Sequence, residues 1–193
     1  MKTCTFTGHR PQHLPFGMNE DDERCTDLKE TLKEQIINLI EAEDVTHFIT
    51  GMALGVDLYA AEIVLDLKAC YPNITLESAI PCETQAVKWS MAQREHYYDI
   101  AAQCDKETML QSHYSPGCMD KRNRYMVDRS DSIIVTDPVT LAVERLYNTQ
   151  KSGVSFKAGG NREGLFASEK SLCYPAIIWM MNLFRCSVWL CTV

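Results

Sequence analysis

The hydrophobic pattern of the first 140 residues alternates between short apolar runs and longer amphipathic stretches. The apolar runs predict strands at residues 2–7, 46–50, 74–80, 106–111 and 131–136. Between them, apolar positions three and four apart predict helices at about 19–40, 58–70, 84–102 and 119–127. Strands separated by helices of this length predict βαβ crossovers. The predicted fold class is therefore α/β, three layers with a mostly parallel sheet and helices on both faces.

Two glycines lie between the second predicted strand and the helix that follows it. Gly51 and Gly55 flank a turn that includes Met52, and Asp57 stands at the start of the helix. A strand that turns through glycine into a helix leaves backbone N–H groups free, and these groups and the helix dipole attract an anion. The alternative is an ordinary connection that Asp57 caps, because the spacing is not a complete dinucleotide-binding fingerprint.

The end of the first predicted strand carries a second group of candidates. Thr7, Gly8, His9 and Arg10 follow one another directly. Because ligands of parallel sheets bind at the carboxyl ends of the strands, we expect this turn and the glycine turn to lie at the same edge. An arginine there is able to hold a phosphate or carboxylate through two parallel hydrogen bonds. The alternative is a surface arginine beside a histidine in a turn.

Aromatic and basic residues further along suggest the rest of the site. Trp89, Arg94 and Tyr97 are predicted on one helix, with Arg94 and Tyr97 on the same side. An aromatic ring beside an arginine can enclose a base or ribose, although a core aromatic with an arginine stem packed on it gives the same pattern. Residues 121–124 form a basic cluster, for which a solvated helix face is the alternative.

Composition narrows the class of protein. The chain has 193 residues, a net charge of −7 and 46% hydrophobic residues, which suits one soluble domain. The acidic balance argues against a nucleic-acid binder but leaves room for a local basic pocket. No signal peptide and no C-x-x-C pair accompany the nine cysteines, so we expect reduced thiols in the cytoplasm and no metal site. The apolar run at 176–193 is interrupted by Arg185, which argues against a membrane span.

Taken in order, the motifs resemble those of a known family. They are Thr7-Gly8-His9-Arg10-Pro11, Thr50 to Asp57, Trp89 with Arg94 and Tyr97, and Arg122 to Asp128. This succession, from residue 1 to about 136, resembles the YpsA/YoqJ-like branch of the SLOG superfamily, which also contains DprA (Smf) and the LOG phosphoribohydrolases. The resemblance implies a Rossmann-like fold and a pocket for a nucleotide or a nucleotide-derived ligand. The catalytic arginine-plus-glutamate motif of LOG enzymes does not appear.

Residues and resemblance together define the predicted site. The predicted ligand-binding residues are Thr7, Gly8, His9, Arg10, Gly51, Met52, Gly55, Asp57, Trp89, Arg94, Tyr97, Arg122 and Asn123. No paired carboxylates or nucleophile elbow predict a catalytic residue. We expect Arg10→Ala or Gly51→Val to abolish stabilisation by nucleotide and to leave the fold largely intact.

The predicted function is binding rather than catalysis. The chain is expected to be a cytoplasmic sensor or scaffold that binds a nucleotide or another phosphorylated small molecule, without a required cofactor, a membrane or a nucleic acid. The first alternative is a LOG-like hydrolase of a nucleotide N-glycosidic or phosphate bond. The second is single-stranded DNA binding like that of DprA, which the negative charge disfavours. The sequence leaves open whether the chain forms a homo-oligomer.

The family pattern breaks near residue 140. A glycine-rich turn ending in threonine, a helix and a strand are expected after the fifth strand, but Leu141 to Arg145 follow instead. One permitted set of codons for Leu141 to Ser155, read from the third base, encodes GGGTAIQYAKKRGI, which resembles the missing turn and helix. We therefore predict a Rossmann-like domain at 1–140, a frameshift, and an out-of-frame tail at 141–193 that leaves the last βα unit disrupted. The alternative is a divergent C-terminal extension.

Overall fold

The computed structural model describes residues 1–136, 155–158 and 189–192. The strands of the sheet are β1 (Lys2–Thr7), β2 (Val45–Thr50), β3 (Thr75–Ile80), β4 (Lys106–Met109), β5 (Ser132–Val135), β6 (Ser155–Ala158) and β7 (Trp189–Thr192). The helices are α1 (Glu23–Glu43), α2 (Val56–Leu67), α3 (Met91–Ala101) and α4 (Cys118–Val127), and a short 3₁₀ turn, η1, spans Pro11–His13.

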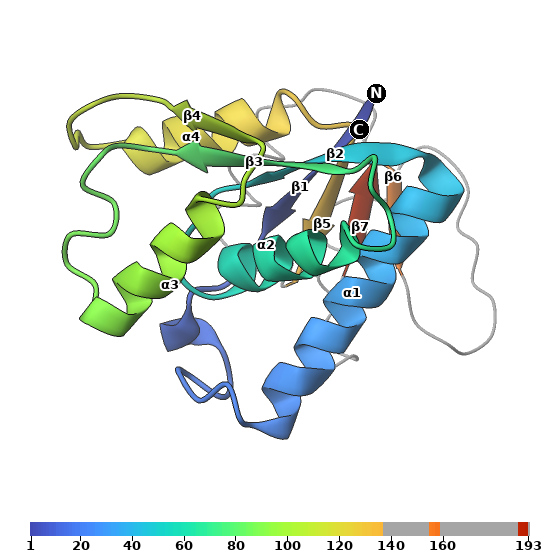
Figure 1. The fold of residues 1–193 in the computed structure, drawn as a ribbon, viewed down its shortest axis with the longest axis horizontal. Helices are drawn as coiled ribbons and strands as arrows, with labels where there is room; N and C mark the ends of the chain where they lie inside the picture. The colour runs from blue at the N-terminus through green and yellow to red at the C-terminus, as the bar shows by residue number, and fades with distance from the viewer. Residues whose placement is uncertain (137–154, 159–188, 193) are drawn as a thin grey trace, which may run out of the picture.

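The strands form one sheet in the order β4-β3-β2-β1-β5-β7-β6 (Figure 1). β1 to β5 pair in parallel, whereas β7 pairs antiparallel with both β5 and β6. The predicted α/β class with a mostly parallel sheet is therefore confirmed. The proposed out-of-frame tail lies outside the described residues apart from the two short strands, so it stays a prediction.

Helices cover both faces of the parallel strands and produce three layers. α1 and α2 lie in front of the sheet in Figure 1 and α4 lies behind it. On the α1 and α2 side, Phe6 and Phe48 stack with ring centroids 6.0 Å apart inside the main apolar core. On the other side, Met126 of α4 packs on Ile49 and Ala79. Successive side chains of a strand point to opposite faces, so the sheet has one apolar core on each face, as expected for a buried parallel sheet.

The predicted helix at 84–102 begins later than expected. α3 starts at Met91, because the Ser90 side chain accepts a hydrogen bond from the Gln93 N–H and the Gln93 side chain accepts one from the Ser90 N–H. This reciprocal capping box fixes the helix start. Trp89 therefore lies in the turn before α3, and the prediction that it shares a helix with Arg94 and Tyr97 is wrong.

The structure also bears on the membrane question. Among the described residues, no helix is both long enough and apolar enough to span a bilayer. The apolar run at 176–193 lies mostly outside those residues.

Candidate functional site

The turns after β1 and β2 meet at the carboxyl edge of the sheet, as their parallel pairing requires. The N–H of Val56 donates to the His9 carbonyl at 3.5 Å. Gly55 has a φ of +93°, and a Cβ built there would lie 2.7 Å from the same carbonyl oxygen. Glycine is needed at Gly55 for both reasons, since a side chain would strain the backbone and separate the two turns.

Several N–H groups of the glycine turn are already bonded within the protein. Met52 donates to the Thr50 hydroxyl at 3.2 Å, and Ala53 donates to Oδ2 of Asp57 at 3.3 Å. Val56, as above, donates to His9. The prediction that free backbone amides here cradle an anion is therefore wrong for these three groups, because side chains of the same loop accept from two of them and the His9 carbonyl accepts from the third.

Arg122 fills the space above the glycine turn. Its guanidinium reaches from α4, donates through Nη1 to the Gly51 carbonyl and lies 3.4 Å from Oδ2 of Asp57. A Cβ built on Gly51 would lie 2.1 Å from Nη1. This geometry argues against the expectation that Gly51→Val leaves the fold largely intact, because valine would displace a buried arginine.

The Arg122–Asp57 pair is buried and internal. The two side chains are 8% and 9% exposed. Burial raises the pKa of Asp57, and the charges of Arg122 and Arg10 and the Ala53 N–H oppose that rise. Burial lowers the pKa of Arg122, while Asp57 opposes that change. Each charge satisfies the other, so the pair holds the loop in shape and leaves little for a ligand to bind.

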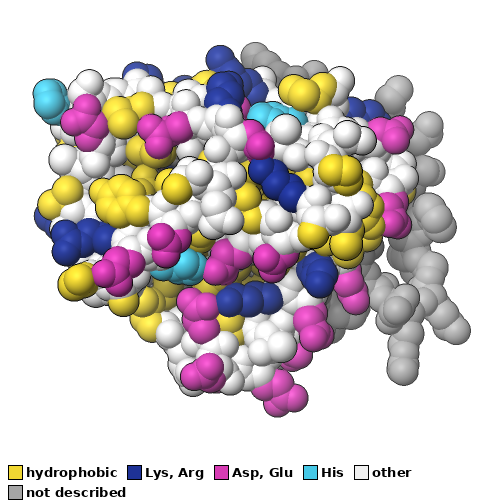
Figure 2. All heavy atoms as spheres, in the orientation of Figure 1, with side chains coloured by type: hydrophobic (Ala, Val, Ile, Leu, Met, Phe, Trp, Pro, Cys, Tyr) yellow, Lys and Arg dark blue, Asp and Glu magenta, His cyan; other side chains and the backbone are white. Residues whose placement is uncertain are grey.

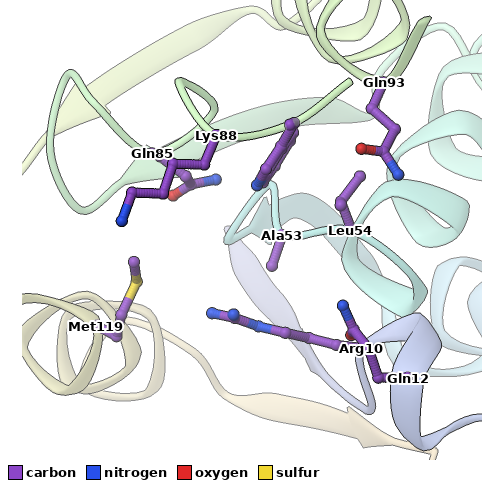
Figure 3. A pocket seen from close by; sticks show the side chains of 9 residues that line it. Arg10, Gln12, Ala53, Leu54, Gln85, Lys88, Gln93 and Met119 are labelled. Carbon is purple, nitrogen blue, oxygen red and sulfur yellow. The ribbon is translucent and has the colours of Figure 1, made fainter. Parts of the chain in front are cut away.

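Beside this pair lies a cavity of about 230 Å³ at the same sheet edge. It is lined by Arg10, Gln12, Ala53, Leu54, Gln85, Lys88, Trp89, Gln93 and Met119 (Figure 3). Arg10 and Lys88 extend toward it from opposite sides. Both side chains are exposed, and neither makes an ion pair with another described residue. The two cations are therefore available to an anionic ligand.

The rest of the cavity wall is held in place by hydrogen bonds and ring contacts. Gln85 Nε2 donates to the Met52 carbonyl at 2.6 Å. The Trp89 indole meets the buried Tyr97 ring edge-on, with centroids 5.5 Å apart and planes at 90°. The Trp89 ring and the Gln85 amide, each held by these contacts, thus join the cations in the cavity wall.

Comparison with known proteins identifies the family. A family model described as "YspA SLOG family" matches residues 4–145. The chain belongs to the YpsA SLOG family. A UPF0398 protein of Halalkalibacterium halodurans is 34% identical over 137 residues, which cover 70% of this chain and 71% of that protein. The UPF0398 protein YpsA of Bacillus subtilis is 28% identical over 155 residues, or 79% of each chain. The resemblance inferred from the motifs is confirmed.

The predicted site residues of this YpsA-family chain separate into two groups. Arg10 and Trp89 line the cavity. The others, apart from Arg94, lie at or near this edge without lining the cavity, and these are Thr7, Gly8, His9, Gly51, Met52, Gly55, Asp57, Tyr97, Arg122 and Asn123. Asn123, for example, accepts a hydrogen bond from Arg122 Nε at 2.9 Å. Most of the predicted set is thus close to the cavity but not part of its lining.

Arg94 is not brought to the cavity. The prediction that Arg94 and Tyr97 form one binding surface is wrong, because Tyr97 is buried in the core while Arg94 is exposed. Tyr97 and Ile100 are the buried residues of α3 and form its core-facing side, and Arg94 lies outside that side.

Sequence reasoning missed the remaining lining residues, namely Gln12, Ala53, Leu54, Gln85, Lys88, Gln93 and Met119. One signal was available: Lys88 and Trp89 put a cation beside an aromatic shortly after β3, at the same edge as Arg10. The glutamines carry no such signal, because uncharged polar residues are ordinary in surface turns.

Proposed function

We propose that this SLOG protein binds a nucleotide or a nucleotide-derived phosphorylated ligand in the cavity, as a cytoplasmic sensor or scaffold. Membership of the SLOG family suggests a nucleotide-related role. The observation that carries the finer proposal is the pair of exposed cations, Arg10 and Lys88, which approach one cavity from opposite sides beside Trp89.

The chemistry of these groups suits a nucleotide. A guanidinium can hold phosphate oxygens through two parallel hydrogen bonds, and an ammonium adds a point charge. An indole face can stack on a base, a contact worth about 1–3 kcal/mol. At about 230 Å³ the cavity is smaller than the roughly 300–1,000 Å³ of sites that enclose a whole small ligand. A nucleotide would therefore be held in part, with the remainder at the mouth.

Hydrolysis is the second candidate, and the lining favours binding over it. The described lining residues include no carboxylate, histidine, hydroxyl or thiol. A general acid or base must lie within hydrogen-bond reach of the bond that it cleaves. The nearby Asp57 carboxylate is already bonded to Ala53 and paired with Arg122. This part of the chain thus offers a binding surface in which Lys88 is the one titratable group besides Arg10 among the described lining residues.

Single-stranded DNA binding is a weaker candidate. Figure 2 shows acidic and basic side chains mixed on one face, with acidic ones gathered around the beginning of α1. Backbone phosphates are bound by continuous basic surfaces. A face of this kind, in a chain of net charge −7, gives little attraction to a polyanion.

A nucleotide panel tests the proposal. The full chain is incubated with AMP, ADP, CMP and GMP, with adenosine as the uncharged control, and thermal unfolding is followed. We expect a phosphate-bearing member to raise the melting temperature more than adenosine does, and chromatography to recover it unchanged. Release of base or phosphate would favour the hydrolase instead. No stabilisation by any member would contradict the proposal.

A further inference from the structure

Gln85 is held in one orientation by the glycine turn. Its side-chain nitrogen donates to the Met52 carbonyl at 2.6 Å and lies 3.4 Å from the Gly51 carbonyl oxygen. Two carbonyls on the same side fix the amide, because the flipped form would place its oxygen against two acceptors. The Gln85 side-chain nitrogen therefore donates within the protein, and its oxygen remains able to accept a hydrogen bond.

That oxygen has no partner. Oε1 of Gln85 is buried, and within the described part of the chain nothing donates a hydrogen bond to it. Nearly all buried polar atoms in proteins are hydrogen-bonded, so an exception calls for an explanation. Gln93, on the same cavity, differs, because its Oε1 accepts from the Ser90 N–H at 3.0 Å. Of these two lining amides, only Gln85 keeps an unused acceptor.

We propose that Gln85 Oε1 accepts a hydrogen bond from an amino group on the ligand's base, so that the cavity selects nucleotides whose base carries an exocyclic amino group. This inference rests on the proposed function. Gln85 and Trp89 belong to the turn between β3 and α3, and both line the cavity. A base stacked on the Trp89 indole turns its polar edge toward this wall, while Arg10 and Lys88 hold the phosphate.

Because Gln85 Oε1 is buried, a ligand's amino group reaches it only if a neighbouring side chain moves. Lys88 lies beside Gln85 on the same wall of the cavity (Figure 3). It is exposed, and its flexible stem can rotate at little cost. The proposal requires that Lys88 moves toward the phosphate and lets the base approach Gln85, so that one ligand engages both residues.

The test uses pairs of nucleotides that differ only in the amino group. AMP is compared with purine riboside 5′-monophosphate, and CMP with pyrimidin-2-one riboside 5′-monophosphate, by calorimetric titration of the full chain. We expect the amino member of at least one pair to bind about tenfold more tightly, the size expected when a buried acceptor gains its only donor. Gln85→Leu should bring the two members within about twofold.

A matched variant controls for the loss of a glutamine as such. Gln103→Leu makes the same change at an exposed glutamine that does not line the cavity, and it should keep the preference for the amino member. Circular dichroism and melting temperature establish that each variant folds. If Gln85→Leu does not fold, Gln85→Met takes its place, because it also removes the amide oxygen and keeps an unbranched side chain of similar length.

The outcomes separate this inference from the function beneath it. Equal affinity for both members of each pair in the wild type would overturn the role of Gln85 and leave nucleotide binding standing. A preference that survives Gln85→Leu would overturn it as well, because another group would then be reading the base. Failure of every nucleotide to bind would overturn the proposed function itself.

Discussion

Two clusters of polar side chains in this domain differ in whether their groups have partners within the protein. The first surrounds Glu77, whose side chain is 2% exposed on the α4 side of the sheet. Its carboxylate accepts from Tyr125 at 2.6 Å, Thr108 at 2.7 Å and Lys106 at 2.9 Å, with His47 Nε2 at 3.1 Å. The donors come from β2, β4 and α4, and Glu77 itself lies on β3, so this cluster ties the helix to the sheet.

The second cluster is the cavity at the carboxyl edge. Arg10 and Lys88 are exposed there without an ion pair among the described residues, and the Gln85 oxygen is buried without a donor. A buried polar network that is fully satisfied stabilises a fold, whereas unsatisfied groups around a cavity are those that a ligand can complete. The difference distinguishes the structural polar residues from those proposed to bind a ligand, without reference to any relative.

The largest expected effect concerns the first cluster. Glu77→Ala leaves Lys106, Tyr125 and Thr108 without their shared acceptor, so we expect the free energy of unfolding to fall by about 3–5 kcal/mol in urea titration. Glu107→Ala is the control, because Glu107 is exposed on β4 and should change stability by less than about 0.5 kcal/mol. Equal losses of stability in Glu77→Ala and Glu107→Ala would contradict the structural role of the Glu77 cluster.

The same carboxylate should make stability depend on pH. Burial raises the pKa of Glu77, but hydrogen bonds from Tyr125, Lys106 and Thr108 outweigh it and bring the pKa to about 2, from an ordinary value of 4.5. As pH falls from about 4.5 toward 2, the unfolded state takes up the proton first, so stability is lost across that window. We expect this group to account for about 2 kcal/mol of the loss.

Glu77→Gln checks this pH dependence. Its free energy of unfolding, measured from pH 5 to 2, should fall less steeply than that of the wild type, whereas Glu107→Gln should follow the wild type. Parallel curves for wild type and Glu77→Gln would show that the carboxylate is not held by its neighbours.

An intermediate loss of stability is expected at Gly51, which contacts Arg122 of α4. Gly51→Ala pushes a methyl group into the Arg122 guanidinium and should destabilise the fold by about 1–2 kcal/mol in urea. In an Arg122→Ala background the same change should have less effect, because the obstructing group is gone. Additive effects of the two substitutions would mean that Arg122 does not occupy the space above Gly51.

These contrasts indicate what the sequence could supply. Periodicity located β1 to β5 to within about two residues, and parallel pairing placed the turns after β1 and β2 together. Arg10 was found because it closely follows a predicted strand, and Trp89 because an aromatic ring near an arginine suggested a site for a base or ribose. The resemblance to SLOG proteins added the supporting residues around them.

The rest depends on contacts that no local pattern encodes. Thr50 and Asp57 bond the amides of their own loop, and Arg122 reaches Gly51 across 71 positions of sequence. Because of these contacts, the backbone groups that were predicted to bind an anion are bonded within the protein. The Ser90-x-x-Gln93 capping box is a pattern that the sequence does contain. It would have moved the predicted start of this helix to Met91 and placed Trp89 in the preceding turn.

The smallest expected effect on stability lies at the cavity. Arg10 is exposed and makes no ion pair with another described residue, so Arg10→Ala should change the free energy of unfolding by less than about 0.5 kcal/mol. A much larger loss, measured in the same urea titration, would place Arg10 among the structural residues with Glu77.

The most direct measurement of the central claim is AMP affinity in the wild type, in Arg10→Ala and in Arg124→Ala, by calorimetric titration at one fixed salt concentration. Arg124 is an exposed arginine of α4 that does not line the cavity. We expect Arg10→Ala to weaken AMP binding by about tenfold or more, the size of a lost charge-assisted contact, and Arg124→Ala to stay within about twofold of the wild type. Equal AMP affinity in all three proteins would contradict the claim that this cavity binds the phosphate of a nucleotide.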